Sequence, residues 1–236
     1  MQEVMPVYQL DPNLVLFPPP QVARYDGLLA VGGDLSPERL LLAYRMGIFP
    51  WYGPGEPILW WAPDPRLVLL PGEFHISRRL ARKLRQGRFS FSTNQDFAGV
   101  IRHCAEIARP GQEGSWLSEE MIAAYLRLHE LGYAHSVECR RDGRLVGGVY
   151  GVALGRVFFG ESMFSLETDA SKAAMAHLVA AMETTGGTMI DCQVKSDHLL
   201  RLGARLVPGP VFYQRLALDI DDEQLTSPPP PATLLL

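Results

Sequence analysis

The order of strand-like and helix-like segments between residues 135 and 218 limits the fold most strongly. Alternating and β-branched residues predict three strands and one hairpin turn, at 135–139, 144–153 and 156–164, with the turn at Leu154-Gly155. Apolar residues at helical spacing and a short apolar run predict helices at 171–185 and 196–202 and a strand at 188–194. The last segment, 204–218, is expected to be a strand pair interrupted by Pro208-Gly209-Pro210. This order predicts an α+β fold with a mixed sheet.

A change in composition divides the 236 residues at about Arg66. Residues 1–66 are rich in proline and tryptophan and are expected to form a small N-terminal domain. Residues 67–220 are expected to form the mixed-sheet domain. Residues 221–236 contain a run of prolines and are expected to be a disordered tail.

The bulk composition excludes several classes of protein. An apolar content of 47% and a charged content of 20% are ordinary for a globular chain. The sequence has neither the pattern of a secretory signal nor a run of about 18 apolar residues, so we expect a soluble cytoplasmic protein without a membrane segment. The three cysteines are far apart and are expected to be reduced thiols. The histidines do not have the spacing of metal ligands, and no serine or cysteine lies in a nucleophile motif. The sequence therefore predicts neither a metal site nor a covalent intermediate.

A run of basic residues indicates a polyanionic partner. Between His75 and Arg88 the chain contains six Arg and Lys residues and no acidic residue. The residues of this run that we consider for nucleic-acid binding are Arg78, Arg79, Arg82, Lys83 and Arg85. A solvated helix face usually mixes both signs, so nucleic acid is favoured over a merely solvated basic helix, although both interpretations remain open.

Acidic and amide side chains interrupt two of the apolar segments. Asp191 and Gln193 lie two apart on a predicted strand, so both are expected on one face, with the Gln193 amide as the hydrogen-bond partner of Asp191. Glu161 lies in an aromatic strand in which Gly160 could host a bulge that changes the alternation of faces. Either acid could be structural. Two acids with an apolar floor between them are more typical of a site for a cationic amine.

Three of the four tryptophans lie in one polar, proline-rich stretch, FPWYGPGEPILWWAPDPR, from Phe49 to Arg66. Trp51 follows a proline and is expected to be exposed. Trp60 and Trp61 are adjacent, so on an extended chain they face opposite ways, one into the seam between domains and one toward a cleft. The sequence leaves open which of them takes which position.

Six ordered motifs resemble the leucyl/phenylalanyl-tRNA protein transferase family. They are GLLAVGGDLS from Gly27 to Ser36, GIFPW from Gly47, LWWAPDPR from Leu59, GESMFS from Gly160, ASK from Ala170 and IDCQ from Ile190. The resemblance implies an aminoacyltransferase that moves Leu, Phe or Met from aminoacyl-tRNA to the N-terminal α-amino group of proteins beginning with Arg or Lys. The product would carry an N-degron for proteolysis. The implied fold is a small N-terminal domain beside a domain like those of GCN5-related N-acetyltransferases.

The resemblance also implies roles for individual residues. Asp191 and Gln193 resemble the catalytic pair, with Glu161 near the acceptor amine. The residues that resemble the substrate-binding set are Trp51 and Trp116 for the terminal adenosine and Phe158 and Met163 for the transferred side chain. Val149 replaces the methionine that we associate with the family, which leaves the preference among Leu, Phe and Met open. The basic run would bind the acceptor stem of Leu-tRNA or Phe-tRNA.

The expected mechanism needs no cofactor, because the ester of an aminoacyl-tRNA is already activated and the enzyme must align the amine and remove a proton. We expect Asp191 to orient Gln193, whose carbonyl would hold the amine; the ribose hydroxyl of the tRNA is an alternative for the proton. Two other classes remain open, an acyl-CoA-dependent N-acetyltransferase and a non-catalytic RNA-binding module. The loop from Ser165 to Lys172 has no glycine for a pyrophosphate, which opposes the first. The second leaves both acids unexplained.

Overall fold

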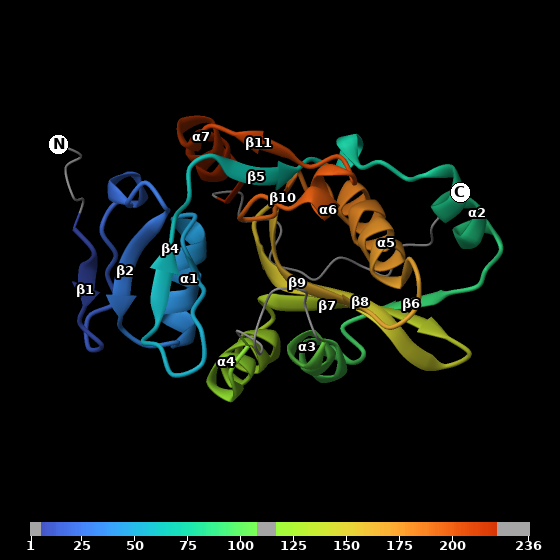
Figure 1. Ribbon diagram of the computed structural model, residues 1–236, viewed down its shortest axis with the longest axis horizontal. Helices are drawn as coiled ribbons and strands as arrows, with labels where there is room; N and C mark the ends of the chain where they lie inside the picture. Colours follow the sequence, from blue (N-terminus) through green and yellow to red (C-terminus); the bar gives the residue numbers. More distant parts are fainter. Residues whose placement is uncertain (1–5, 108–116, 221–236) are drawn as a thin grey trace.

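The computed structural model describes residues 6–107 and 117–220. In these residues the strands form a four-stranded and a seven-stranded sheet, which lie side by side in Figure 1. The smaller sheet has the order β1-β2-β4-β3, with bounds Tyr8–Leu10, Leu28–Gly32, Leu59–Trp61 and Phe49–Pro50. Helix α1 (Pro37–Arg45) connects β2 to β3, and a short 3-10 helix, η1 (Pro20–Val22), precedes β2.

The larger sheet has the order β11-β5-β10-β9-β8-β7-β6. Its strands in that order are Arg205–Val207, Arg66–Leu69, Met189–Asp191, Val157–Ser165, Arg144–Leu154, Ala134–Arg141 and Ser90–Thr93. The pair β9 and β10 is parallel and the other neighbouring pairs are antiparallel. The sheet is therefore mixed, which confirms the predicted α+β class.

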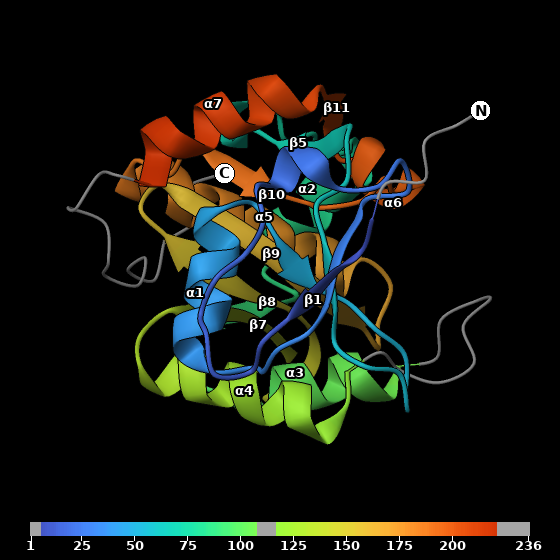
Figure 2. The same ribbon diagram turned by 90° about the vertical axis from the view of Figure 1, so that its left-hand side faces the viewer.

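Helices cover both faces of the larger sheet (Figure 1). Helices α3 (Phe97–Glu106) and α4 (Glu119–Glu130) pack on one face, and α5 (Ala170–Thr185) packs on the other. The view in Figure 2 looks onto the smaller sheet and shows α1 above α4. The remaining helical segments are η2 (Pro71–Glu73), α2 (Arg78–Arg85), α6 (Asp197–Leu200) and α7 (Gly209–Ile220). Among the described residues, no helix is both long and apolar enough to cross a membrane.

Two hydrophobic cores lie on opposite faces of strand β9. Phe159 and Phe164 belong to the core that also includes α3, α4 and much of the smaller sheet, whereas Phe158 belongs to the core under α5. Trp60 is fully buried in the first core, where its Nε1 donates to the carbonyl of Gly32 at 2.8 Å and its ring packs on Phe17. The first core therefore joins the smaller sheet to the larger one.

A β-bulge changes the alternation of β9. Ser162 pairs with Tyr150 and Gly160 pairs with Gly151, so Glu161 is the extra residue between the two pairs. A bulged residue shifts every side chain beyond it to the other face. The prediction that a bulge at this point changes the faces is confirmed, and the consequence is that Phe158 and Met163 line the same side of the strand.

Two predicted strands differ from the structure. The strand predicted at 188–194 ends at Asp191, because Gln193 takes a left-handed conformation with φ of +63° that a strand does not accommodate. Of the strand pair predicted at 204–218, the first strand is present as β11, but the second is wrong because helix α7 follows. Proline at the helix start and buried Phe212, Leu216 and Asp219 at helical spacing favour α7.

Candidate active site

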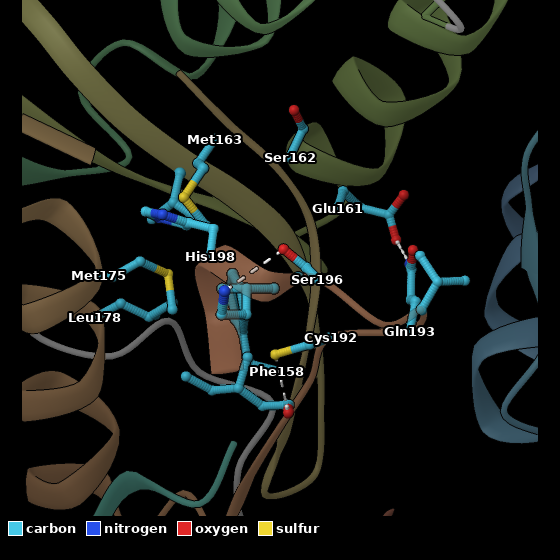
Figure 3. A pocket seen from close by; sticks show the side chains of 15 residues that line it. Phe158, Glu161, Ser162, Met163, Met175, Leu178, Cys192, Gln193, Ser196 and His198 are labelled. Atoms are coloured by element: carbon cyan, nitrogen blue, oxygen red, sulfur yellow. Dashed lines mark hydrogen bonds between the residues drawn. The ribbon is translucent and has the colours of Figure 1, made fainter. Parts of the chain in front are cut away.

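A cavity of about 630 Å³ opens between β9, β10, α5 and α6 (Figure 3). Its floor is apolar and includes both residues that were predicted for the transferred side chain, Phe158 and Met163, together with Val149, Met175, Leu178 and Ile190. Polar side chains line the rest of the cavity, namely Glu161, Ser162, Gln193, Ser196 and His198. The cavity can therefore bury an apolar group while a polar reacting group stays beside Glu161 and Gln193.

Glu161 accepts hydrogen bonds from two directions. The Tyr125 hydroxyl on α4 donates to Oε2 at 2.6 Å, and the Gln193 amide Nε2 donates to Oε1 at 2.8 Å. The hydroxyls of Tyr125 and Tyr44 lie 2.6 Å apart, which links α4 to α1. Figure 3 shows Glu161 and Gln193 side by side, joined by the hydrogen bond between them. The bulged residue is thus fixed by groups from three separate segments.

Burial raises the pKa of Glu161 to about 7, and the neighbouring charge of Asp191 adds to this effect. Hydrogen bonds from Tyr125, Tyr44 and Gln193 oppose the rise, because they stabilise the ionised carboxylate. Burial and the charge of Glu161 raise the pKa values of Tyr44 and Tyr125 well above 10, so both hydroxyls stay protonated. Glu161 is therefore a carboxyl group that changes its charge near neutral pH.

Asp191 has a different partner from the one predicted. Its carboxylate is fully buried and accepts from Arg66 Nε at 2.8 Å and Nη2 at 2.7 Å. Its Oδ1 also accepts the backbone N–H of Gln193 at 2.9 Å, while the Gln193 side chain turns to Glu161. The expectation that the Gln193 amide satisfies Asp191 is wrong, because the strand ends before Gln193 and the left-handed backbone redirects its side chain.

Arg66 is enclosed by aromatic rings. The guanidinium carbon lies 4.8 Å from the ring centroids of both Phe49, on β3, and Phe212, on α7. Since Arg66 is also fully buried, its charge is balanced by Asp191 and by these ring faces. Arg66 thus connects the smaller sheet and α7 to the turn that holds Gln193.

The tryptophans divide between the core and the surface. Trp51 is 36% exposed, its ring centroid lies 5.8 Å from that of Trp61, and its carbonyl accepts the Trp61 Nε1–H. Trp60 is the residue that packs the seam between the sheets, so Trp61 is the one that accompanies Trp51. The exposure predicted for Trp51 is confirmed. Trp116 lies outside the described residues.

The basic run lies apart from the cavity. Residues 78–85 form helix α2, which packs against α5 at the end of the molecule far from the smaller sheet (Figure 1). Arg78, Arg79, Arg82 and Arg85 are exposed. Lys83 is instead held by Asp169 and by the carbonyl of Thr168, at 2.5 and 3.0 Å. The structure therefore brings together Glu161, Gln193, Phe158 and Met163, with Asp191 behind them, but not the cations of α2.

Three residues support this site although the sequence does not reveal their roles. Arg66 lies 125 positions from Asp191, and Tyr44 and Tyr125 lie 117 and 36 positions from Glu161. Arg66 ends a motif in which the tryptophans are the conspicuous residues, and the two tyrosines have the helical spacing of core residues. Nothing local in the sequence signals that their polar ends meet the acids.

Metal-binding clusters and exposed thiols are absent from the described part of the chain. Within residues 6–107 and 117–220, no group of three or more His, Cys, Asp and Glu side chains could hold a metal ion. Cys104, Cys139 and Cys192 are buried thiols that form no disulfide, as predicted. His129 and His135 are held by the carbonyl of Ala134 and by Asn94.

An apolar cavity that ends at a carboxylate and an amide, within a mixed α+β fold, suits a protein that holds an apolar group beside a polar one. Sequence comparison identifies the protein family. The leucyl/phenylalanyl-tRNA protein transferase family matches residues 68–217, and the N-terminal domain of that family matches residues 33–64. The chain belongs to the leucyl/phenylalanyl-tRNA protein transferase family, a family of aminoacyltransferases.

Individual relatives support the same assignment. The leucyl/phenylalanyl-tRNA–protein transferase of Syntrophobacter fumaroxidans is 56% identical over 92% of this chain and 93% of its own length. That of Syntrophus aciditrophicus is 57% identical over 88% of this chain and 87% of its own length. Among solved structures, a GCN5-related N-acetyltransferase from Kribbella flavida aligns with 72% of this chain and 60% of its own, at 14% identity and a TM-score of 0.36. A TM-score this low supports no conclusion about the present chain.

Proposed function

We propose that this enzyme transfers Leu, Phe or Met from aminoacyl-tRNA to the α-amino group of proteins that begin with Arg or Lys, without a cofactor and in the cytoplasm. The product would carry an N-degron for proteolysis. The observation that carries this proposal is the apolar cavity that ends at Glu161 and Gln193. The cavity suits an apolar side chain, and the two polar groups suit the amine that attacks its carbonyl carbon.

The donor side chain would enter the cavity between Phe158 and Met163. Since one methylene changes binding by only about 1 to 3 kcal/mol, Leu, Phe and Met are expected to overlap as donors, whereas Ala is not. Val149 lines the cavity opposite Met163 and would take part in this selection. The exposed ring of Trp51, with Trp116, would stack on the terminal adenosine, which is worth about 1 to 3 kcal/mol per base.

The acceptor amine would lie at Gln193 and Glu161. The Gln193 amide donates to Glu161 through Nε2, so its Oε1 is the atom that would accept from the amine. Asp191 would act through the backbone: it accepts the Gln193 N–H and is neutralised by Arg66, so its charge is not directed at the amine. The catalytic set is then Glu161 and Gln193, with Asp191 as the residue that positions Gln193.

The exposed arginines of α2 would bind acceptor-stem phosphates. We expect the combined change of Arg78, Arg79, Arg82 and Arg85 to Ala to weaken aminoacyl-tRNA binding and to flatten its dependence on salt, because fewer counterions are released. Filter binding between low and physiological salt measures this slope. Lys83 is left unchanged because its ion pair with Asp169 supports the start of α5.

A matched control removes four exposed arginines elsewhere, namely Arg45, Arg102, Arg127 and Arg144. This control is expected to keep the salt slope of the parent protein. An unchanged slope in the α2 variant would mean that α2 is a solvated helix without a role in tRNA binding.

The function is tested by offering labelled Leu-tRNA and Phe-tRNA to peptides that begin with Arg, Lys, Asp or Ala. Transfer is expected to the Arg and Lys peptides alone. Transfer to none of the peptides would overturn the proposed function, and transfer only to Asp would assign the enzyme a different acceptor class.

The described residues at the start of α5 do not favour acyl-CoA as the donor. The loop before α5 holds Asp169 in a left-handed conformation, and its carboxylate is paired with Lys83 and Lys172. Both lysines at the start of this helix are therefore already paired with a carboxylate, which a pyrophosphate would have to displace. Tight binding of acetyl-CoA in a titration would contradict this interpretation.

A further inference from the structure

We propose that Glu161 takes the proton from the attacking amine and returns it to the leaving ribose oxygen, while the hydroxyls of Tyr125 and Tyr44 hold its carboxylate in place. This inference rests on the proposed function and deepens it, because it assigns the proton transfer to one carboxylate, that of Glu161. It also identifies the two tyrosines as positioning residues.

The geometry gives Glu161 access to the reacting atoms. Its side chain lines the cavity, Tyr125 donates to its Oε2, and Gln193 donates to its Oε1. A carboxylate oxygen that accepts one hydrogen bond keeps a further lone pair for an amine proton. An amine held by Gln193 Oε1 would lie beside Glu161, because the amide that holds it donates directly to the carboxylate.

The other ionisable groups near the cavity are poorly suited to this task. Asp191 is fully buried and engaged by Arg66. Burial raises the pKa of the Cys192 thiol, so it remains protonated at neutral pH. Burial and the charges of Lys172 and Arg201 lower the pKa of His198, which weakens it as a base. Of the described groups that line the cavity, Glu161 is therefore the carboxylate able to accept the proton.

The groups around Glu161 set the pH range in which its carboxyl group gains and loses a proton. Tyr44 faces it from α1, Tyr125 from α4 and Asp191 from β10, with Arg66 behind Asp191. Tyr150 on β8 packs against Tyr125. The resulting pKa of about 7 suits a group that must both accept and donate at neutral pH.

The proton and the electron pairs balance over the whole transfer. The lone pair of the amine nitrogen forms a bond to the ester carbonyl carbon, the π pair of the C=O bond moves to the carbonyl oxygen, and the nitrogen loses one proton to the Glu161 carboxylate. The pair on the carbonyl oxygen then re-forms the C=O bond while the bond from that carbon to the ribose oxygen breaks, and the protonated Glu161 gives its proton to the ribose oxygen. The products are the extended peptide and tRNA with a free hydroxyl, and Glu161 returns to its ionised form.

The decisive variant is Glu161→Gln, which keeps the size of the side chain. Its turnover is expected to fall by about 10²-fold or more, with a smaller effect on KM, because general base catalysis typically contributes about 10² to 10⁴. In the parent protein, kcat is expected to fall as the pH drops below about 7, because Glu161 becomes protonated; we call this fall the acidic limb. The acidic limb is expected to be absent from Glu161→Gln. A rate within about threefold of the parent, with the limb intact, would overturn the proposal.

Two milder variants test the tyrosines without removing the base. Tyr125→Phe removes a donor that favours the ionised carboxylate, so the acidic limb is expected to move to higher pH by roughly one unit. Tyr44→Phe is expected to move it in the same direction by less. Tyr133→Phe, a partly buried tyrosine outside the cavity, is the control and is expected to leave the limb unchanged. An unmoved limb in Tyr125→Phe would contradict the positioning role.

A rescue experiment distinguishes a base from a structural carboxylate. Glu161→Ala is expected to lose transfer, and added formate is expected to restore part of it in proportion to the formate ion present. No rescue, together with an unmoved limb in Tyr125→Phe, would assign Glu161 a structural role. Loss of transfer in the parent protein with every peptide would instead refute the proposed function, so the two failures are distinguishable.

Discussion

Asp191→Asn is expected to lower turnover by about 10²-fold or more while aminoacyl-tRNA binding changes little. The Asp191 carboxylate neutralises Arg66 and accepts the backbone N–H of Gln193. Asparagine keeps the size but loses the charge, so it cannot hold both partners equally well. The turn at Gln193 would then relax, and the amide that aligns the amine would lose its position. Single-turnover kinetics and filter binding measure the two effects separately.

The same variant is expected to lose stability. A buried ion pair that loses one partner leaves an uncompensated charge, which typically costs about 3 to 5 kcal/mol. Urea unfolding measures this loss, and Arg66→Lys, which keeps the charge but not the two-point contact, is expected to lose less. Asp26→Asn removes one partner of an exposed pair with Arg24 and is expected to cost about 1 kcal/mol or less.

Turnover near that of the parent protein in Asp191→Asn would contradict the positioning role. A folded variant with normal turnover would mean that Gln193 keeps its place without the carboxylate. Equal losses of stability in Asp191→Asn and Asp26→Asn would mean that the buried pair with Arg66 contributes no more to stability than the exposed pair.

Gly151→Ala is expected to have the second large effect, because it removes the space that the bulge needs. A Cβ at this position would meet the backbone carbonyl oxygen of Phe159 far inside normal contact distance, and backbone cannot move aside cheaply. Overpacking of this kind typically costs about 1 to 3 kcal/mol, and we expect the upper end of that range. Since the bulge positions Glu161, transfer activity is expected to fall as well. Urea unfolding and the peptide transfer assay measure the two losses.

The control for this prediction is the glycine across the ladder. A Cβ on Gly160 would meet its nearest atoms at 3.6 Å, which is ordinary contact, so Gly160→Ala is expected to unfold at nearly the parent urea concentration. Equal stability of the two variants would show that the β8 and β9 register tolerates a side chain at Gly151 and that the bulge is not constrained there.

The parts of the fold that the sequence predicts are those with local causes. The hairpin between β8 and β9 arises from alternation and from Gly155 in a left-handed turn, and its turn residues are Gly155-Arg156, one position later than predicted. Helix α5 arises from a long apolar helical stretch. The second strand of the predicted final pair is wrong because the proline and glycine residues at 208–210 begin helix α7 and do not interrupt a strand.

The site could be predicted only in part. The sequence points to Glu161, Gln193, Phe158 and Met163, and the structure brings them to one cavity. Two other pairings, of Arg66 with Asp191 and of Tyr44 with Tyr125, join residues 125 and 81 positions apart. Such contacts depend on how the two sheets pack, which no local pattern contains. The roles assigned to individual side chains remain predictions for mutagenesis.

We propose that one cavity receives the donor side chain beside the groups that activate the acceptor. The most direct measurement is a crystal structure with a non-hydrolysable amide analogue of leucyl-adenosine. The leucyl side chain is expected between Phe158 and Met163, with its carbonyl carbon next to Gln193 and Glu161 and its adenine against Trp51. A leucyl group bound outside this cavity, or a carbonyl carbon remote from Glu161 and Gln193, would contradict the claim.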